Sequence, residues 1–553
     1  MMFSGDGRRN ILKRMQEKEH DLLIIGGGIT GAGIALDAVA RGMDTALVEM
    51  QDFAAGTSSR STKLVHGGLR YLKNFEFKMV AEVGRERAVV YENAPHVTTP
   101  EWMLLPIYEG GSLGKLTTSI GLYIYDKLAG VKRSERRVIL SAEETLRREP
   151  LLKREGLIGG GYYVEYRTDD ARLTVEVLKR AAAEGALAVN YAKAEHLIYE
   201  DGKVAGAEVF DRLTGGRYQI RARRIVNAAG PWADTVREMD RSKNGKTLHL
   251  TKGVHLVFDQ SRFPLRQAVY FDTPDGRMVF AIPRDGKTYI GTTDTDYDGD
   301  LENPACTDED RDYLLNAANS VFPDLKLTAA DVESTWAGLR PLIHEEGKSP
   351  SEISRKDEIF VSPTGLISIA GGKLTGYRKM AEQVVDLVAR SLQEDSLAGK
   401  PFGPCRTKTM KLSGGDVGGS ANFSQFVREK TEQGAALGLS PDAAERLARR
   451  YGSNVDQVYR IAAERGEEAE RYGLAPEELA ALEYAVSFEM AVKPDDFLIR
   501  RSGALLFDIG WACRRKDAVT RYMAERLGWT ESQTAAFAAE MERHFERATL
   551  RHA

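Results

Sequence analysis

Residues 20–49 read HDLLIIGGGITGAGIALDAVARGMDTALVE, and this stretch decides the fold that we expect for the whole chain. Asp21–Ile25 is a short apolar run that is typical of a buried strand. Three glycines follow it in the register G-x-G-x-x-G, namely Gly26, Gly28 and Gly31. In such a unit one glycine permits a tight turn, one lets the backbone approach a pyrophosphate, and one lets a helix pack closely on the strand. The stretch therefore predicts a turn that holds a dinucleotide.

The residues after the glycines complete a strand–helix–strand unit. A helical face continues to Arg41-Gly42, and Thr45–Val48 predicts a second strand. The helix would point its free N–H groups at the phosphates. Glu49 ends the second strand, about 20 residues after the glycines, where an acid can accept hydrogen bonds from an adenosine ribose. The alternative is an ordinary βαβ turn, and the motif alone does not choose between NAD and FAD.

Length and composition set the broad class. A chain of 553 residues predicts more than one domain. A net charge of -4 gives no sign of a nucleic-acid partner. The cysteines Cys306, Cys405 and Cys513 are too scattered for a disulfide frame or a cysteine-based metal site, so we expect no metal and a cytoplasmic setting. No apolar run reaches the roughly 18 residues of a spanning helix, so any membrane contact would be peripheral.

Later segments indicate an antiparallel sheet and then helices. From about Leu248 to Asp300, alternating residues and turn pairs such as Asp275-Gly276 predict antiparallel strands. After residues 399–404 the composition shifts towards Ala, Glu, Arg and Leu. Helical periods follow at 441–451, 454–465, 476–491, 515–527 and 530–547, and they predict a separate helical domain.

Three further stretches contain residues that could bind a phosphate, a cofactor or a membrane surface. Thr57–Lys63 crowds small hydroxyl groups beside two cations, which suits phosphate or the polar edge of a cofactor, although a helix cap is the commoner use. Gly371-Gly372 turns a strand into a helix whose first turns hold Lys373, Thr375 and Arg378, giving a second positive helix end. The apolar, aromatic run 117–128 lies among cations and could rest on a membrane surface, although a buried core helix is more common.

Taken together, these motifs resemble the FAD-dependent glycerol-3-phosphate dehydrogenases, bacterial respiratory enzymes with a mitochondrial counterpart. The matching blocks run in the family's order over roughly residues 20–390: DLLIIGGGITGAGIALDAVARG, TSSRSTKLVHGGLRYL, NAAGPW, KGVHLVF, GTTDTDY, WAGLRPL and GGKLTGYRKMAE. The resemblance implies an α/β FAD-binding domain of glutathione-reductase and D-amino-acid-oxidase type, with an interleaved antiparallel-sheet substrate domain and an all-α C-terminal domain. We expect a lead-in at 1–19, the interleaved domains at 20–400 (the substrate part at approximately 75–165 and 245–345), and the helical domain at 401–553.

The resemblance also implies a function. Hydride would pass from C2 of sn-glycerol 3-phosphate to FAD, giving dihydroxyacetone phosphate, and electrons would pass on to membrane quinone. It further implies a homodimer, either cytoplasmic or peripheral on the inner face of the cell membrane. A dianionic phosphate ester needs a cationic pocket, preferably with arginine forks. We expect a chain that ends at about residue 400 to keep FAD.

Site residues follow position by position from the resemblance. His255 would accept the proton of the C2 hydroxyl, for which a histidine pKa near neutrality is suited, while Arg340 or Lys373 steadies the developing alkoxide. Without the resemblance, His255 would be taken as a core histidine and each arginine as a surface residue. Arg70, Tyr71 and Arg355 would contact substrate. The residues expected at the cofactor are Gly26, Gly28, Gly31, Glu49, Thr57, Ser58, Ser59, Lys63, Gly67, Gly68, Ala229, Gly230, Gly338, Gly371, Gly372 and Thr375.

Three alternatives stay open. A glycerol-3-phosphate oxidase shares nearly every motif and uses oxygen, but we would expect a sizeable insertion in its substrate domain, and none is evident. An amine or amino-acid oxidase of the same superfamily would need residues that clamp the carboxylate of its substrate, whereas the several cations in this sequence favour phosphate. A non-catalytic flavin-binding module would have these cations only by accident.

Overall fold

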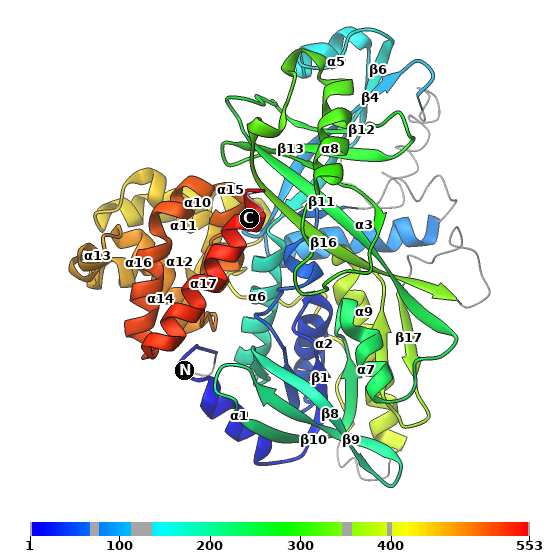
Figure 1. The fold of residues 1–553 in the computed structure, drawn as a ribbon, viewed down its shortest axis with the longest axis vertical. Coiled ribbons are helices and arrows are strands. Elements are labelled where there is room, and N and C mark those ends of the chain that lie inside the picture. The colour runs from blue at the N-terminus through cyan, green and yellow to red at the C-terminus, as the bar shows by residue number, and fades with distance from the viewer. Residues whose placement is uncertain (1–2, 67–76, 112–134, 346–356, 395–400, 551–553) are drawn as a thin grey trace.

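The computed structural model describes residues 3–66, 77–111, 135–345, 357–394 and 401–550. These residues form a sheet flanked by helices, a second sheet that stands above it, and a C-terminal group of helices beside both (Figure 1). Within these ranges, no helix joins enough length to enough apolar character to cross a bilayer. The candidate membrane segment 117–128 lies outside the described residues.

The first sheet is built around β1 (His20–Ile25), whose residues are almost all buried. β1 pairs in parallel with β2 (Thr45–Val48) and with β10 (Arg217–Asn227). A continuous apolar run is typical of a parallel strand that is covered on both faces. Between β1 and β2 lies α2 (Ile29–Ala40), so the predicted strand–helix–strand unit is confirmed.

Other strands extend this sheet on both sides. β7 (Leu187–Val189) pairs in parallel with β2, and β18 (Ile367–Ala370) pairs in parallel with β10. An antiparallel edge strand and a hairpin complete it, namely β17 (Glu358–Val361), β8 (Ala192–Glu200) and β9 (Lys203–Asp211). The carboxyl ends of the parallel strands therefore meet at one edge, where open α/β sheets bind their ligands.

Helices cover the first sheet through apolar stripes. They are α1 (Arg8–Gln16), α6 (Asp170–Ala183), α7 (Ala233–Met239) and α9 (Tyr377–Glu394). α9 buries Val384, Val388 and Leu392 at helical spacing, and α2 packs against both α6 and α9. The resulting core fixes the position of the glycine turn at the end of β1.

The second sheet supplies the platform beside that turn. Its strands are β3 (Leu64–Val65), β4 (Thr98–Tyr108), β5 (Val138–Leu140), β6 (Leu157–Thr168), β11 (Lys246–Asp259), β12 (Ala268–Asp272), β13 (Met278–Arg284), β14 (Lys287–Gly291), β15 (Thr295–Asp296) and β16 (Val332–Glu345). The antiparallel strands expected between 248 and 300 are confirmed. One pair, β12 with β4, is parallel. The helices of this part are α3 (Phe77–Asn93), α5 (Ala142–Arg148) and α8 (Asp308–Val321).

The C-terminal part is helical, as expected. Its helices are α10 (Phe423–Ala436), α11 (Pro441–Tyr451), α12 (Val455–Glu464), α13 (Gly466–Tyr472), α14 (Pro476–Phe488), α15 (Ala504–Phe507), α16 (Ile509–Leu527) and α17 (Glu531–Ala548). A π-helical segment, η11 (Asp496–Arg501), precedes α15. Short 3₁₀ turns lie at η1 (Thr57–Ser59), η4 (Gly230–Trp232), η5 (Pro323–Leu325), η6 (Ala329–Asp331), η8 (Leu374–Gly376), η9 (Ser420–Asn422) and η10 (Gly452–Asn454).

Buried ion pairs join the C-terminal part to the first sheet. The Asp52 carboxylate, which is fully buried, accepts hydrogen bonds from Arg501 at 2.7 and 2.9 Å and from Arg500 at 2.5 Å. Asn190, beside β7, donates to the same carboxylate. Although burial opposes ionisation, the two guanidinium groups hold the pKa of Asp52 well below its ordinary value. The helices after η11 are therefore anchored to the segment that directly follows Glu49 and Gln51.

Candidate active site

The glycine turn after β1 needs its glycines for close backbone approaches. Gly26 has a φ of +115°, and a Cβ there would overlap the carbonyl of Ala228. A Cβ on Gly31 would overlap the carbonyl of Gly26, because α2 starts directly against the turn. The Ser58 hydroxyl accepts a hydrogen bond from the Ile29 N–H at 2.9 Å, which ties η1 to the first turn of α2. The turn thus leaves the positive end of α2 facing the strand edge.

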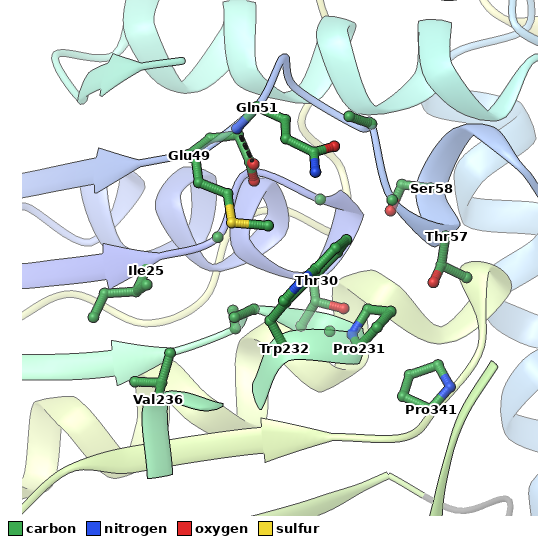
Figure 2. A pocket seen from close by; sticks show the side chains of 18 of the residues that line it. Ile25, Thr30, Glu49, Gln51, Thr57, Ser58, Pro231, Trp232, Val236 and Pro341 are labelled. Atoms are coloured by element: carbon green, nitrogen blue, oxygen red, sulfur yellow. Dashed lines mark hydrogen bonds between the residues drawn. The ribbon is translucent and has the colours of Figure 1, made fainter. Parts of the chain in front are cut away.

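A cavity of about 260 Å³ opens at this edge (Figure 2). Figure 2 shows Glu49 and Gln51 on one side, Thr57 and Ser58 on another, and Trp232 between them. The lining residues are Ile25, Gly26, Gly28, Ile29, Thr30, Val48, Glu49, Met50, Gln51, Ala55, Gly56, Thr57, Ser58, Ala192, Lys193, Ala194, Ala228, Ala229, Gly230, Pro231, Trp232, Thr235, Val236, Met239, Glu302, Pro341, Gly371, Gly372, Lys373 and Leu374.

Glu49 is held by two backbone N–H groups, one in the glycine turn and one after β2. Its Oε2 accepts the Gly27 N–H at 2.6 Å, and its Oε1 accepts the Gln51 N–H at 2.8 Å. Burial raises the pKa of Glu49, although these two hydrogen bonds act in the opposite direction. A carboxylate oxygen has a second lone pair, so Glu49 can still accept a hydrogen bond from a hydroxyl group of a ligand in the cavity.

Many of the residues expected at the cofactor line this cavity. They are Gly26, Gly28, Glu49, Thr57, Ser58, Ala229, Gly230, Gly371 and Gly372. Gly31 packs beneath the turn, and a Cβ on Gly338 would overlap the carbonyl of Arg60. Gly67 and Gly68 lie outside the described residues, as do the substrate candidates Arg70, Tyr71 and Arg355.

Lys63 and Ser59 do not line this cavity, and Lys63 belongs to a buried ion pair. The Lys63 ammonium donates to Asp170 Oδ1 at 2.6 Å and to the Ser59 carbonyl at 2.9 Å. Its side chain is 4% exposed and that of Asp170 is 0% exposed. The lysine therefore anchors the end of η1 to the start of α6, which positions the hydroxyl groups of Thr57 and Ser58.

The second glycine junction lines the same cavity as the first. Gly371 and Gly372 have φ values of +76° and +82°, and Lys373 precedes η8 and α9. Thr375 donates from its hydroxyl to the His66 carbonyl at 3.1 Å. Arg378, which we expected to add positive charge here, is buried and donates to both carboxylate oxygens of Glu86 at 2.7 and 2.6 Å. Lys373 is thus the cation of this junction that lines the cavity.

His255 lies on the second sheet, between a glycine and a tryptophan. Its register partners on the two neighbouring strands are Gly291 and Trp336. The imidazole stacks on the Trp336 ring at 4.5 Å, and a Cβ on Gly291 would overlap it. Nε2 lies 3.0 Å from the Thr62 hydroxyl, whereas Nδ1 is buried without a hydrogen-bond partner among the described residues. The glycine leaves space for the ring, and the tryptophan fixes its plane.

The expected near-neutral pKa of His255 is not what the structure shows. Burial lowers the pKa of His255 well below 6.5, and the charges of Arg340 and Lys63 lower it further. The ring is therefore a neutral imidazole at physiological pH, able to accept a proton but a weaker base than an exposed histidine. A bound anion beside it would shift the pKa upwards again.

Arg340 is held by the segment that follows β14. Its Nη2 donates to the Thr292 hydroxyl at 2.9 Å, and its Nη1 donates to Asp294 Oδ1 at 3.1 Å and to the Thr293 carbonyl at 3.2 Å. A Cβ on Gly253 would collide with the guanidinium, so this glycine leaves it room. The side chain is 30% exposed, which makes the charge accessible to a ligand. Arg340 directly precedes Pro341, which lines the cavity.

Sequence reasoning missed part of the lining. Trp232 stood in the quoted block NAAGPW, yet we gave no role to its ring, which lines the cavity and would lie 3.2 Å from a Cβ on Gly56. Ala192–Ala194 and Glu302 come from strands and loops with no local motif. The pairing of β2 with β7, from which the chain enters β8, is what places Ala192–Ala194 beside Glu49.

The residues present fit the FAD that the resemblance implies. The glycine turn allows backbone to approach a pyrophosphate, the N-terminus of α2 supplies positive potential, and Glu49 can accept ribose hydroxyls. Thr57 and Ser58 add hydroxyl groups to the same wall.

We expect Gly31→Ala to raise the Kd for FAD by at least about tenfold, because overpacking of this kind costs about 1–3 kcal/mol. The added methyl group would press on the Gly26 carbonyl and displace the turn. Fluorescence titration of the apoprotein measures the change. Gly510→Ala on α16 is the matched control, since its Cβ would meet only the end of the Arg514 side chain. Equal FAD affinity in Gly31→Ala and wild type would contradict this account of the turn.

Comparison with known proteins agrees with this description. Residues 21–378 match the family model described as FAD dependent oxidoreductase. Residues 405–534 match the C-terminal domain of alpha-glycerophosphate oxidase. A structure of the glycerol-3-phosphate dehydrogenase from Bacillus halodurans, complexed with FAD, is similar at a TM-score of 0.87 and 55% identity, covering 99% of each chain.

Curated relatives give the same result over nearly the whole length. An aerobic glycerol-3-phosphate dehydrogenase from Bacillus subtilis is 64% identical over 530 residues, covering 96% of this chain and 95% of the relative. One from Staphylococcus aureus is 58% identical over 553 residues, covering 99% and 98%. An L-alpha-glycerophosphate oxidase from Mycoplasma pneumoniae, 18% identical at a TM-score of 0.54, shares the fold. The chain therefore belongs to the FAD-dependent glycerol-3-phosphate dehydrogenase family.

Proposed function

We propose that this chain oxidises sn-glycerol 3-phosphate to dihydroxyacetone phosphate. The observation that carries the proposal is the grouping of two cations and a neutral histidine beside a cavity that fits FAD. Lys373 lines that cavity, Arg340 directly precedes the lining residue Pro341, and Arg340 is close enough to His255 to lower its pKa. The printed names of the most similar relatives support the same substrate.

Each residue of the proposed site has a role in the oxidation that follows from its chemistry. When bound, FAD supplies the acceptor for the hydride that leaves C2. The guanidinium of Arg340 and the ammonium of Lys373 would bind phosphate or the developing alkoxide, because cations stabilise negative charge best where water is excluded. His255 would accept the hydroxyl proton on a ring nitrogen, since its lowered pKa keeps the ring neutral before reaction. Arg70, Tyr71 and Arg355 complete the proposed set.

An anaerobic absorbance experiment tests the proposal. Addition of glycerol 3-phosphate to the FAD-bound protein should bleach the visible flavin bands and form one dihydroxyacetone phosphate per FAD. Glycine and proline serve as comparison substrates, since they represent the amino-acid oxidases of the same superfamily. Bleaching by an amino acid but not by glycerol 3-phosphate would exclude the proposed substrate.

We further propose that electrons pass to membrane quinone and not to oxygen. The dehydrogenase names of the similar relatives and the absence of an evident oxidase-type insertion in the sequence support this choice. The C-terminal match described as alpha-glycerophosphate oxidase makes the oxidase the second candidate. The ratio of quinone reduction to peroxide formation under air decides between them. A homodimer, peripheral on the inner face of the cell membrane, is proposed from the resemblance, and vesicle co-sedimentation and light scattering test it.

We expect His255→Ala to slow flavin reduction by about 10²–10⁴-fold, the usual contribution of a general base. Substrate binding should change much less, because the cations stay in place. The wild-type rate should not fall between about pH 8 and pH 6.5 through protonation of His255, since burial and its cationic neighbours hold its pKa well below 6.5. Stopped-flow single turnovers measure both effects.

The matched control is His249→Ala. His249 is partly exposed, lies on β11 like His255, and pairs with Asp296 of β15. It should reduce flavin at the wild-type rate. A His255→Ala variant with wild-type single-turnover kinetics would require another base.

A further inference from the structure

A second cavity, of about 80 Å³, lies where η1, β16 and the C-terminal helices meet. It has room for a small ion with water, since a volume of about 15 Å³ holds one water molecule. Three arginines and a histidine are among its lining residues: Arg60, Arg500, Arg547 and His544. The expected substrate residues His255, Arg340 and Lys373 are not among the described residues that line it. Trp336 lies between this cavity and His255, because it lines the cavity and also stacks on the His255 ring.

Two of these arginines have only neutral hydrogen-bond partners within the described residues. Arg60 Nη2 donates to the Glu302 carbonyl at 3.1 Å, and Arg547 Nη1 donates to Asn303 Oδ1. Neither forms an ion pair with a carboxylate in the described parts of the chain. Burial and the charges of Arg500 and Arg547 lower the pKa of Arg60 to about 10. Arg60 and Arg547 therefore bring two guanidinium charges to a small, partly enclosed space.

The acidic groups near this cavity already have hydrogen-bond or ion-pair partners. Arg500 pairs with Asp52, Asp495 and Asp496 at 2.5–2.8 Å. Asp300, which influences both Arg60 and Arg547, is exposed and accepts hydrogen bonds from Asn303 and from the Glu302 N–H. Burial lowers the pKa of His544 to about 4, so this ring is neutral at physiological pH.

A cation is a poor candidate for this region. Asp495, Glu540 and His544 bring ligand atoms within 4.8 Å of one another, as a metal site would require. However, Asp495 is bound by Arg500 and Glu540 by Lys493, each at 2.8 Å. A metal ion would have to displace both positive groups, whereas an anion would be attracted by the arginines.

We propose that this cavity binds a small oxyanion of the phosphate type, held by the guanidinium groups of Arg60 and Arg547. Planar guanidinium forks match the oxygens of such an anion and form charge-assisted hydrogen bonds to it. The site goes beyond the proposed catalytic function, because none of the residues that we assign to substrate oxidation contributes to it. Its ligand is either free phosphate or a phosphomonoester.

The test is titration of the FAD-bound protein with inorganic phosphate, followed by calorimetry and by ³¹P NMR. An Arg340→Ala background removes one of the cations that we propose to bind phosphate in the substrate region, and so weakens phosphate binding there. We expect saturable binding to one site, weakened at least about tenfold in Arg60→Gln/Arg547→Gln, because each lost charge-assisted bond contributes about 1.4 kcal/mol or more. Arg449→Gln/Arg460→Gln, which removes two exposed arginines from α11 and α12, should bind phosphate as the background does.

Two results would overturn the proposal. One is the absence of saturable phosphate binding, and the other is equal binding to the Arg60→Gln/Arg547→Gln and control variants. Should the double variant fold poorly, Arg60→Lys provides the second test, since it keeps the charge, loses the fork and should weaken phosphate measurably. Titration with glycerol 3-phosphate in the same background distinguishes a phosphomonoester site from a free-phosphate site. These readouts do not depend on turnover, so they stand apart from the proposed activity.

Discussion

Arg340→Ala should lower kcat/KM for glycerol 3-phosphate by about 100-fold, because the lost contacts are charge-assisted and contribute about 1.5–3 kcal/mol each. Thr292 and Asp294 hold the guanidinium from one side, so it is positioned before substrate arrives. Such preorganisation lowers the cost of binding charge in the transition state. Steady-state kinetics with a quinone analogue give the value.

Two variants make this result specific. Arg340→Lys should recover part of the loss, since it keeps the charge but not the planar fork. Arg262→Ala should leave the kinetics unchanged, because Arg262 pairs with Asp331 at 2.6 Å and does not line the cavity in the described part of the chain. If Arg340→Ala and Arg262→Ala have the same kcat/KM as wild type, Arg340 is not a substrate residue.

Asp52→Ala should lower the free energy of unfolding by about 3–5 kcal/mol, the usual cost of breaking a buried ion pair by removing one partner. Arg500 and Arg501 would be left without the carboxylate that both bind. FAD should also bind more weakly, since Asp52 directly follows the cavity residues Glu49 and Gln51. Denaturant unfolding and FAD titration measure the two effects.

The matched control is Glu143→Ala, which breaks the exposed pair with Arg147 and should lower the free energy of unfolding by less than about 1 kcal/mol.

The contribution of Asp52 to the free energy of unfolding depends on pH with a definite sign. Because the folded pKa of Asp52 is lowered, its contribution is present above the ordinary value of 3.8 and is lost as the pH falls towards the folded value. Equal stability in Asp52→Ala and Glu143→Ala would contradict the anchoring role.

The same pairs change one expectation from the sequence. We expected a chain that ends at about residue 400 to keep FAD, because the composition shift there indicated a separate domain. Such a chain would leave Asp52 without Arg500 and Arg501, so we now expect it to lose FAD. A composition shift marks a change of helix content, and it carries no information about ion pairs across a junction.

Local patterns predicted two central strands of the first sheet. Thr45–Val48 is β2 as expected, and the predicted strand Asp21–Ile25 differs from β1 by one residue. Apolar periodicity and glycine spacing act over a few residues, and they carry this information directly. The parallel pairing of β12 with β4 joins residues far apart in sequence, and no local pattern reports it.

Charged residues were the harder part of the site. Arg378 was expected to add positive charge at the start of its helix, yet it is bound by Glu86, 292 residues away. Lys63 is bound by Asp170, 107 residues away. The low pKa of His255 depends on burial and on Arg340, which the neighbouring strand β16 supplies. Residue type indicates that a charge is present. Only tertiary structure determines whether that charge pairs with another side chain or is available to a ligand.

We propose that FAD lies along the turn Gly26–Gly31 and that glycerol 3-phosphate binds between FAD and the cations Arg340 and Lys373. A crystal structure of the slow variant His255→Ala, with FAD and glycerol 3-phosphate bound, tests this most directly. We predict pyrophosphate density at the N-terminus of α2 and substrate density within hydrogen-bond distance of Arg340 or Lys373. Substrate density away from both cations, or FAD density away from the glycine turn, would contradict the account.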